Sequence, residues 1–335
     1  MNTRHNQFHP DERTGPFYYS PLYLLPASIL SLTTYERAEA VNHGLTLVAL
    51  AILFYLLAIQ MSPGRQIALF IVFLTSHLTL SQFLYQNWTV LLALLLLVAW
   101  IRTRKENNFS ASLIWALLIH LKIYMGILLL PLFLSGKGRT ARLAILWTIL
   151  LALIVLPFIG SSPFLAYGKA LASAGSGMTS FFNQVSIPAT ILRFSQPPRE
   201  WVRPEGPVDA PLLASLFYLG LPALFLILLL WKTDLDHRLG ATLIYVLLFV
   251  PHVWDHMMLL LLLLLPFLQW GFFLALSILF ALTYFYDTVV HQLLYMILVE
   301  NLPLLSLRSF LLFFPFLTVL TLGGLLKSRL SFPIK

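Results

Sequence analysis

The sequence predicts an all-α integral membrane protein with about eleven crossings of the bilayer, and three observations support this prediction. Hydrophobic residues make up 59% of the 335 positions and charged residues 10%, against roughly 25% charged residues in an ordinary soluble domain. Apolar blocks such as 91–98 and 259–265 recur along the chain, and most basic residues lie in short segments between the blocks. A soluble globule cannot bury that much apolar surface, so soluble, disordered and fibrous classes are excluded.

The composition also excludes several kinds of chemistry and partner. The chain has no cysteine, which rules out disulfide scaffolds, thiolate metal sites and cysteine nucleophiles. It has no phosphate-binding loop, HExxH helix or dinucleotide fingerprint, so we expect no cofactor and no metal. The net charge of +8 indicates the positive-inside rule rather than nucleic-acid binding, because the basic residues flank apolar blocks. The first 16 residues are polar, and no cleavable signal peptide is expected there.

The apolar stretches define the elements in order, and all of them are expected to be helical. They lie at about 42–61, 66–81, 87–101, 109–134, 142–160, 212–231, 239–270, 271–286 and 303–326. An untilted helix needs about 20 apolar residues to cross a bilayer, so several of these stretches are short crossings. Two others are anomalous and are predicted to be hairpins.

The first predicted hairpin is 109–134, which carries Lys122 at its centre and basic residues beyond both ends. A single crossing would place one basic cluster on the outer side of the membrane, whereas two short legs meeting at Lys122 place both in the cytoplasm. The second is 239–270, which is interrupted by Pro251 and by ionisable side chains within 252–256. Proline breaks a helix, and charges at mid-bilayer depth are costly unless they line a wet cavity.

Eleven crossings place the N-terminus outside and the C-terminal basic residues inside. The cytoplasmic loops then hold twelve of the 21 basic residues and three of the 13 acidic residues, a net charge of +9, against −1 for the rest of the chain. The twelve are Arg65, Arg102, Arg104, Lys105, Lys137, Arg139, Arg142, Lys232, Arg238, Lys327, Arg329 and Lys335. We expect 1–335 to form one transmembrane domain, within which 161–211 is a large outer loop with a short helix at 163–173.

The same topology brings the polar segments to the outer face. These segments are the N-terminus, 85–87, the bend at Lys122, the loop 161–211 and the break at 254–256. Crossings of about 12–16 residues span only about 18–24 Å, so their outer ends stop below the membrane surface. We therefore expect a recessed, outward-opening cavity that suits a substrate with a polar head and a lipid tail.

The ionisable residues of these segments are the candidates for chemistry. Asp255 and His256, beside Trp254, suit a base, a proton shuttle or a ligand, although a polar plug at a helix end would have the same sequence. Lys122 either snorkels to the interface or binds a phosphate as a point charge. Arg193 either grips a phosphate or sugar hydroxyls, or is a solvated loop residue.

Several segments resemble, in order, the motifs of glycosyltransferase family 87. They read FYYSPLYLLP, QFLYQNWTVLLALLLL, LLIHLKIYMGILLLPLFL, NQVSIPATILRF and PHVWDHMMLLLLLLLP. The family pattern has an aromatic-x-Pro near the start, a Gln-Asn before an apolar helix and a Lys before a Pro-containing helix. It continues with an Asn-Gln in the large outer loop and a Trp-x-His near the late break. The resemblance extends over about 17–270 and fits the topology derived above.

Members of that family are C-type membrane enzymes, typified by polyprenyl-phosphate-mannose-dependent α-mannosyltransferases. The resemblance implies that a hexosyl unit, typically mannosyl, moves from a polyprenyl phosphate sugar to a lipid or glycan acceptor. The implied place is the outer face of a bacterial plasma membrane. The implied base is Asp255 or Asp11, although Asp11 otherwise looks like part of a solvated tail, and the phosphate would be held by Lys122, Arg193 and His256. The further donor-binding residues would be Gln86, Asn87, Asn183, Gln184, Tyr19 and Trp254.

One departure from the family keeps alternatives open. Family members usually begin with a transmembrane helix and an outer loop that carries the catalytic Asp, and this sequence begins just before the aromatic-Pro motif. Either an upstream part is missing, or the base is different, or the chain is an inactive member. A transporter or flippase of lipid-linked sugars would use the same polar cavity as a transit site, and it should show an inner gate or acidic coupling residues inside the bundle.

Overall fold

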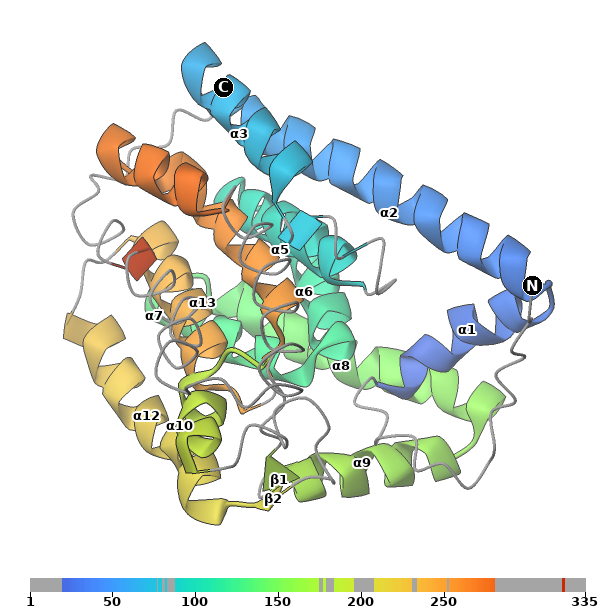
Figure 1. The fold of residues 1–335 in the computed structure, drawn as a ribbon. Helices are drawn as coiled ribbons and strands as arrows, with labels where there is room; N and C mark the ends of the chain where they lie inside the picture. Colours follow the sequence, from blue (N-terminus) through green and yellow to red (C-terminus); the bar gives the residue numbers. More distant parts are fainter. Residues whose placement is uncertain are drawn as a thin grey trace, which may run out of the picture.

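The computed structural model is helical, as the sequence predicts, and its helices form one bundle (Figure 1). It describes residues 20–76, 78–79, 82, 88–174, 177–178, 184–195, 208–230, 234–251, 253–280 and 321–322. Strands within these ranges are limited to β1 (Gly177–Met178) and β2 (Val208–Asp209), which pair antiparallel. Both lie inside the segment predicted as the large loop.

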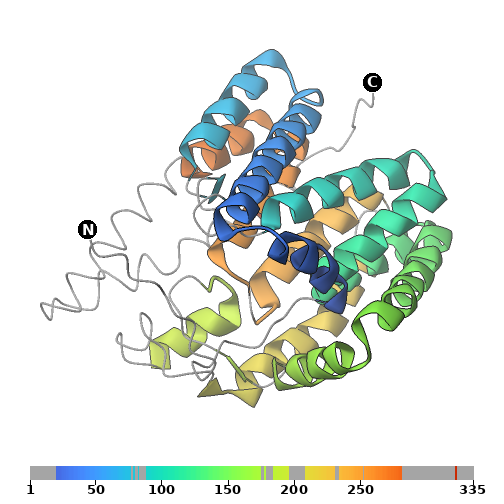
Figure 2. The ribbon, with the colours of Figure 1, turned by 90° about the vertical axis from the view of Figure 1, so that its right-hand side faces the viewer.

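Three of the described helices are long and apolar enough to cross a bilayer: α2 (Tyr35–Ala58), α8 (Gly138–Ile159) and α12 (Pro211–Leu230). Leu45, Ile149 and Leu226, one from each helix, are more than half exposed. Exposed apolar surface of this extent marks contact with lipid or with another protein. In Figure 2, α2 and α3 (blue) lie on one side of the bundle, and α12 (yellow) lies on the opposite side.

The remaining helices are shorter. They are η1 (Pro21–Tyr23), α1 (Leu24–Ser31), α3 (Pro63–Thr75), α5 (Thr89–Arg104), α6 (Asn108–Leu121), η2 (Ile123–Leu128), α7 (Leu129–Leu134), α9 (Ser162–Ala174), α10 (Ile187–Ser195), α13 (Leu235–Phe249), η3 (Asp255–Phe267) and a helix over Trp270–Phe280. The helix predicted at 163–173 is therefore present as α9. Residues 281–300, and with them part of the stretch 271–286, lie outside the described residues, as does nearly all of 303–326.

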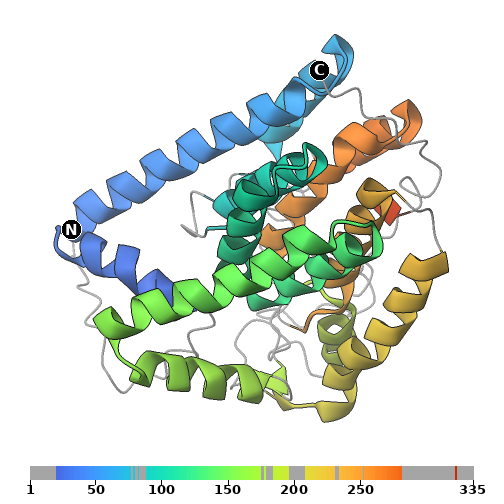
Figure 3. The same cartoon turned by 180° about the vertical axis from the view of Figure 1, so that it is seen from behind.

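The segment predicted as the first hairpin does turn back at Lys122. Helix α6 ends at Leu121, and Lys122 has an extended backbone (φ −147°, ψ 111°) before η2 and α7 begin. Two contacts show that the start of α6 lies beside the start of α8. In the first, Nζ of Lys137 is 2.7 Å from Oε1 of Glu106. Oγ1 of Thr140 likewise donates to Oδ1 of Asn108 at 2.6 Å. The chain thus leaves and returns at the same end of the bundle, and Figure 3 shows α8 running along the bundle beside α6.

The second predicted hairpin also turns back. Helix α13 ends at Phe249, before Pro251, and η3 begins at Asp255. The start of α13 and the end of η3 both contact Trp100 of α5: Oδ1 of Asp236 accepts from its indole nitrogen at 2.6 Å, and the ring of Phe267 stacks on it with centroids 5.0 Å apart. The break at 250–254 therefore lies at the other end of α5.

The centre of the core is η3. Residues 257–265 are each at most 1% exposed, and α5 and α13 pack against them. A 3₁₀-helix of 13 residues is long, since runs beyond three or four residues are uncommon. Because η3 is buried on all sides, its sequence is apolar throughout and shows no alternation of apolar and polar residues.

At two boundaries a polar cap extends the helix beyond its predicted apolar stretch. Helix α2 begins at Tyr35 rather than near 42, because Oγ1 of Thr34 accepts a hydrogen bond from the backbone N–H of Arg37. Helix α13 begins at Leu235 rather than at 239, because the carboxylate of Asp234 accepts from the N–H of His237. Thr and Asp are strong N-cap residues. The short helices η1 and α1 were not predicted at all.

Candidate active site

Three separate segments meet around Met257 at one end of the bundle. Oγ1 of Thr89, at the start of α5, lies 3.5 Å from the sulfur of Met257, and Oη of Tyr124, in η2, lies 3.8 Å from it. Thr89 follows Gln86 and Asn87 in the sequence, Tyr124 follows Lys122, and Met257 follows the Trp254–His256 break. The bends of both hairpins and the start of α5 therefore share one end, which we call the Lys122 end.

The large loop is joined to the same end through backbone contacts. Gln184 and Trp254 form an antiparallel bridge, and the N–H of Val185 donates to the carbonyl of Val253 at 2.8 Å. Oγ of Ser186 also donates to the carbonyl of Pro251 at 3.3 Å. A segment that the sequence could only describe as an outer loop thus pairs with the break that precedes η3.

Arg193 is buried beside this bridge. It lies in α10 and is 1% exposed. One terminal guanidinium nitrogen donates to the carbonyl of Gln184, and the other donates to Oγ1 of Thr190 at 3.0 Å. Arg193 is therefore not the solvated loop residue that one reading allowed. It places a cation next to the Gln184–Trp254 bridge and stabilises the turn that forms it.

The aromatic and ionisable residues of the break lie together. The rings of Trp254 and His256 are nearly parallel, at 11°, with centroids 6.5 Å apart. Asp255 lies between them in the chain and is the first residue of η3. Trp254 and His256 are both half-buried, so part of each ring faces outward from the core.

Lys122 lies near the level of the middle of α8. His120, two residues before it in the last turn of α6, contacts the carbonyl of Thr148 at 3.0 Å, and Thr148 lies near the middle of α8. At 1.5 Å per residue, α6 spans about 21 Å and α8 about 33 Å. The end of α6 therefore stops well short of the end of α8. Lys122 itself is half-buried.

Several predicted site residues fall outside the described residues. These are Asp11, Tyr19, Gln86, Asn87 and Asn183, and the side chain of Asp255. The structure thus brings together the backbone at Asp255 with Trp254, His256, Gln184 and Arg193. It joins the Lys122 segment to this group through Tyr124 and Met257.

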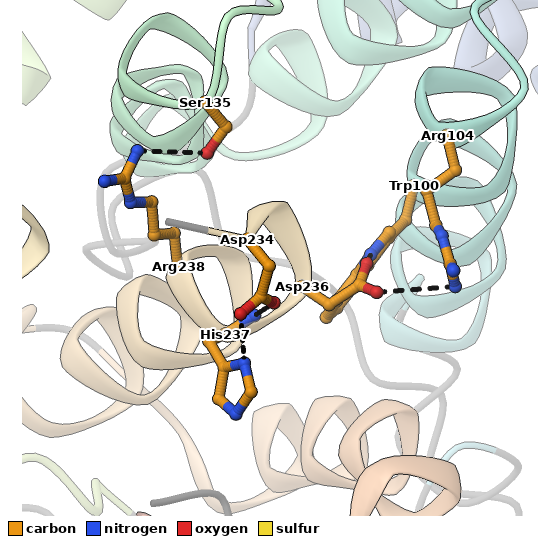
Figure 4. Close-up of polar contacts among 7 residues, drawn as sticks. All are labelled: Trp100, Arg104, Ser135, Asp234, Asp236, His237 and Arg238. Atoms are coloured by element: carbon orange, nitrogen blue, oxygen red, sulfur yellow. Dashed lines mark hydrogen bonds and ion pairs between the residues drawn. The ribbon is translucent and has the colours of Figure 1, made fainter. Parts of the chain in front are cut away.

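A second polar cluster occupies the opposite end, which we call the Trp100 end. Asp236 accepts from Trp100 and lies 3.4 Å from Arg104, while Arg238 donates to the carbonyl of Leu134 and contacts Ser135 (Figure 4). Asp236 and Arg238 are buried, although the sequence placed both in a solvated loop. They are buried because the Asp234 cap starts α13 early, which draws them into its first turn.

The Trp100 end also carries an exposed ion pair. The ammonium of Lys137 donates to Glu106 at 2.7 Å and holds the pKa of that carboxyl below its usual range. This pair joins the turn before α6 to the turn before α8. The last turn of α5 carries Arg102 and Arg104, and α8 carries Arg139 and Arg142 near its start, which is consistent with the charge asymmetry read from the sequence.

Sequence reasoning missed Ser20, Thr89, His120, Tyr124 and Met257. A signal existed for His120, which is a polar residue in the last turn of an apolar helix, two positions before Lys122. No such signal marked Thr89 or Met257, because an apolar or hydroxyl side chain next to a motif is common. Within the described ranges, no group of three or more His, Asp or Glu residues is placed to hold a metal ion.

Comparison with known proteins gives one match. The sequence pattern of glycosyltransferase family 87 matches residues 17–253. This range includes Lys122, Gln184 and Arg193 and ends at the residue before Trp254. No curated protein and no solved structure matches the chain.

Proposed function

The chain belongs to glycosyltransferase family 87, and we propose that it transfers a hexosyl unit at the Lys122 end of the bundle. The proposed donor is a polyprenyl phosphate sugar, typically a mannosyl donor, and the acceptor is a hydroxyl of a lipid or glycan. The observation that carries this proposal is the meeting of both hairpin bends, the start of α5 and the large loop at one end of the bundle. Such an arrangement lets a lipid-borne head group reach polar side chains while its tail stays in the bilayer.

The proposed reaction needs a base and a cation. The acceptor hydroxyl loses its proton to the base as its oxygen forms a bond to the anomeric carbon, and the bond from that carbon to the phosphate oxygen breaks with inversion. Polyprenyl phosphate then leaves with the bonding electrons. A base contributes about 10²–10⁴-fold to such a step, and fixed cations stabilise the charge that develops on the departing phosphate.

We assign these roles to the residues that gather at the Lys122 end. Asp255 is the preferred base, with Asp11 as the second candidate, and Lys122, His256 and Arg193 hold the phosphate. The support for Arg193 is its position, buried beside the Gln184–Trp254 bridge. Tyr19, Gln86, Asn87, Asn183, Gln184 and Trp254 are the proposed contacts to the donor.

We further propose that the Lys122 end faces the outside of the plasma membrane and the Trp100 end faces the cytoplasm. Support comes from the basic residues at the turns before α6 and α8, since short cytoplasmic loops carry excess Lys and Arg.

The proposal is tested with the purified full chain in proteoliposomes that contain a radiolabelled polyprenyl phosphate sugar and a membrane lipid extract as acceptor source. Label that moves into a new lipid or glycan product supports it. Label that crosses the bilayer while still attached to its polyprenyl phosphate, with no new product, would instead identify a flippase.

A further inference from the structure

Ser20, His120 and Thr148 form a hydrogen-bonded chain that joins three segments close to Lys122. Nδ1 of His120 lies 2.8 Å from Oγ of Ser20, and Nε2 lies 3.0 Å from the carbonyl oxygen of Thr148. Ser20 caps η1, His120 lies in the last turn of α6, and Thr148 lies midway along α8. Ser20 is 4% exposed and His120 is 6% exposed.

The partners of His120 fix the direction of each hydrogen bond. A carbonyl oxygen can only accept, so Nε2 carries a proton and donates to Thr148. In the neutral imidazole, which burial favours, Nδ1 is then an acceptor, and the hydroxyl of Ser20 donates to it. The same Oγ accepts from the N–H of Leu22 at 3.4 Å. Ser20 is therefore held in one orientation from both sides.

The position of Ser20 matters because of what the chain carries on either side of the contact. The residues before Ser20 include Asp11 and Tyr19, which are two of the proposed site residues, and His120 is two residues before Lys122. The contact between Ser20 and His120 thus links the residue that directly follows Tyr19 to the bend that carries Lys122, the proposed phosphate ligand.

We propose that His120 is a positioning residue, which fixes Ser20 and the start of η1 against the end of α6. This inference rests on the proposed function, because the segment is positioned for sugar transfer. His120 itself contacts no substrate. A displacement of about 1 Å at a reacting group can lower a rate by about 10²-fold, so loss of this contact should act on turnover.

Two substitutions at one position separate the two hydrogen bonds. In His120→Asn the amide oxygen can replace Nδ1 as the acceptor for Ser20, whereas in His120→Gln the amide nitrogen can replace Nε2 and the contact to Ser20 is lost. Ser20→Ala removes the same contact from the other side. We expect His120→Gln and Ser20→Ala to lower kcat for sugar transfer about 10–100-fold, with donor KM little changed, while His120→Asn keeps most of the activity.

A second readout tests the position of the segment without any activity. Because the chain has no cysteine, spin labels can be placed on Ile29→Cys, in α1 directly after η1, and on Ile123→Cys, and the distribution of distances between them measured by electron paramagnetic resonance. A control pair on Ile123→Cys and Ile149→Cys, both at exposed positions, reports the packing of the Lys122 bend on α8. We expect the 29–123 distribution to broaden in His120→Gln and Ser20→Ala, and the 123–149 distribution to stay unchanged.

The outcomes separate this inference from the proposed function. A 29–123 distribution that stays unchanged in both variants would overturn the positioning role, and so would equal broadening of both pairs, which would indicate general loosening. Broadening of the 29–123 pair alone, in a chain that transfers no sugar, would support the positioning role and reject the proposed function.

Discussion

The indole nitrogen of Trp100 donates a 2.6 Å hydrogen bond to Oδ1 of Asp236, at the first turn of α13. The same indole ring stacks on Phe267, at the end of η3. One residue of α5 therefore holds both ends of the second hairpin. Because α13 runs from Trp100 to the Lys122 end and η3 runs back from there to Trp100, this contact determines the level at which Trp254, Asp255 and His256 lie.

Removing the Asp236 carboxylate should destabilise the fold. In Asp236→Ala the buried indole N–H of Trp100 loses its acceptor, which costs about 1–3 kcal/mol, and the ion pair of Asp236 with Arg104 is lost. Asp236→Asn keeps an oxygen for Trp100 and should lose less. Thermal unfolding of the detergent-solubilised chain measures both, with Glu106→Ala as the control because exposed ion pairs contribute little. A loss for Glu106→Ala equal to that for Asp236→Ala would contradict this account.

The bridge between the large loop and the late break should accept a disulfide. Residues paired across antiparallel strands have Cα atoms about 4.5–5.5 Å apart, which lies within the range that a disulfide spans. In this cysteine-free chain, Gln184→Cys with Trp254→Cys should therefore cross-link under mild oxidation. The control pair is Ser195→Cys with Trp254→Cys, because Ser195 lies at the far end of α10. Cross-linking of the control pair at the same rate would mean that the bridge is not a preferred contact.

The two ends of the bundle should lie on opposite sides of the membrane. Single cysteines at Lys122 or Asp255 are expected to react with an impermeant thiol reagent added to intact cells, whereas single cysteines at Arg104, Arg139 or Lys327 are expected to react only after permeabilisation. The charge asymmetry between the ends is the physical reason. Labelling of position 104 or 139 from outside would reverse the proposed orientation.

The charge of Lys122 should act on donor binding. Lys122→Ala is expected to raise the donor KM, because the phosphate loses a cation, and Lys122→Arg should restore part of the affinity. Lys105→Ala is the matched control, since it removes an exposed lysine at the Trp100 end. An equal rise in KM for Lys105→Ala would show that net charge, rather than the Lys122 end, governs binding.

The breaks of the chain could be read from the sequence, because they depend on local chemistry. Pro251 cannot continue a helix, and a lone Lys122 between two basic segments is costly within a single crossing. The end of α6 at Leu121 and the end of α13 at Phe249 follow from these two features.

The contacts between segments could not be read in the same way. The hydrogen bond from Trp100 to Asp236 joins residues 136 positions apart, and neither residue type marks its partner. From the sequence, Asp236 and Arg238 looked like charges of a loop. The cap that draws them into α13 depends on a single residue, Asp234, which precedes the apolar run. The bridge of Gln184 to Trp254 likewise depends on how the loop folds back, for which apolar periodicity carries no information.

The most direct test of the account is sugar transfer by Asp255→Asn, measured in a single turnover from a radiolabelled polyprenyl phosphate sugar, with donor binding measured on the same preparation. The amide keeps the shape of the side chain and takes up no proton, so we predict a fall in rate of about 10²–10⁴-fold with donor binding retained. Wild-type chain and Lys105→Ala should transfer equally well. Transfer by Asp255→Asn at the wild-type rate would contradict the assignment of Asp255 as the base.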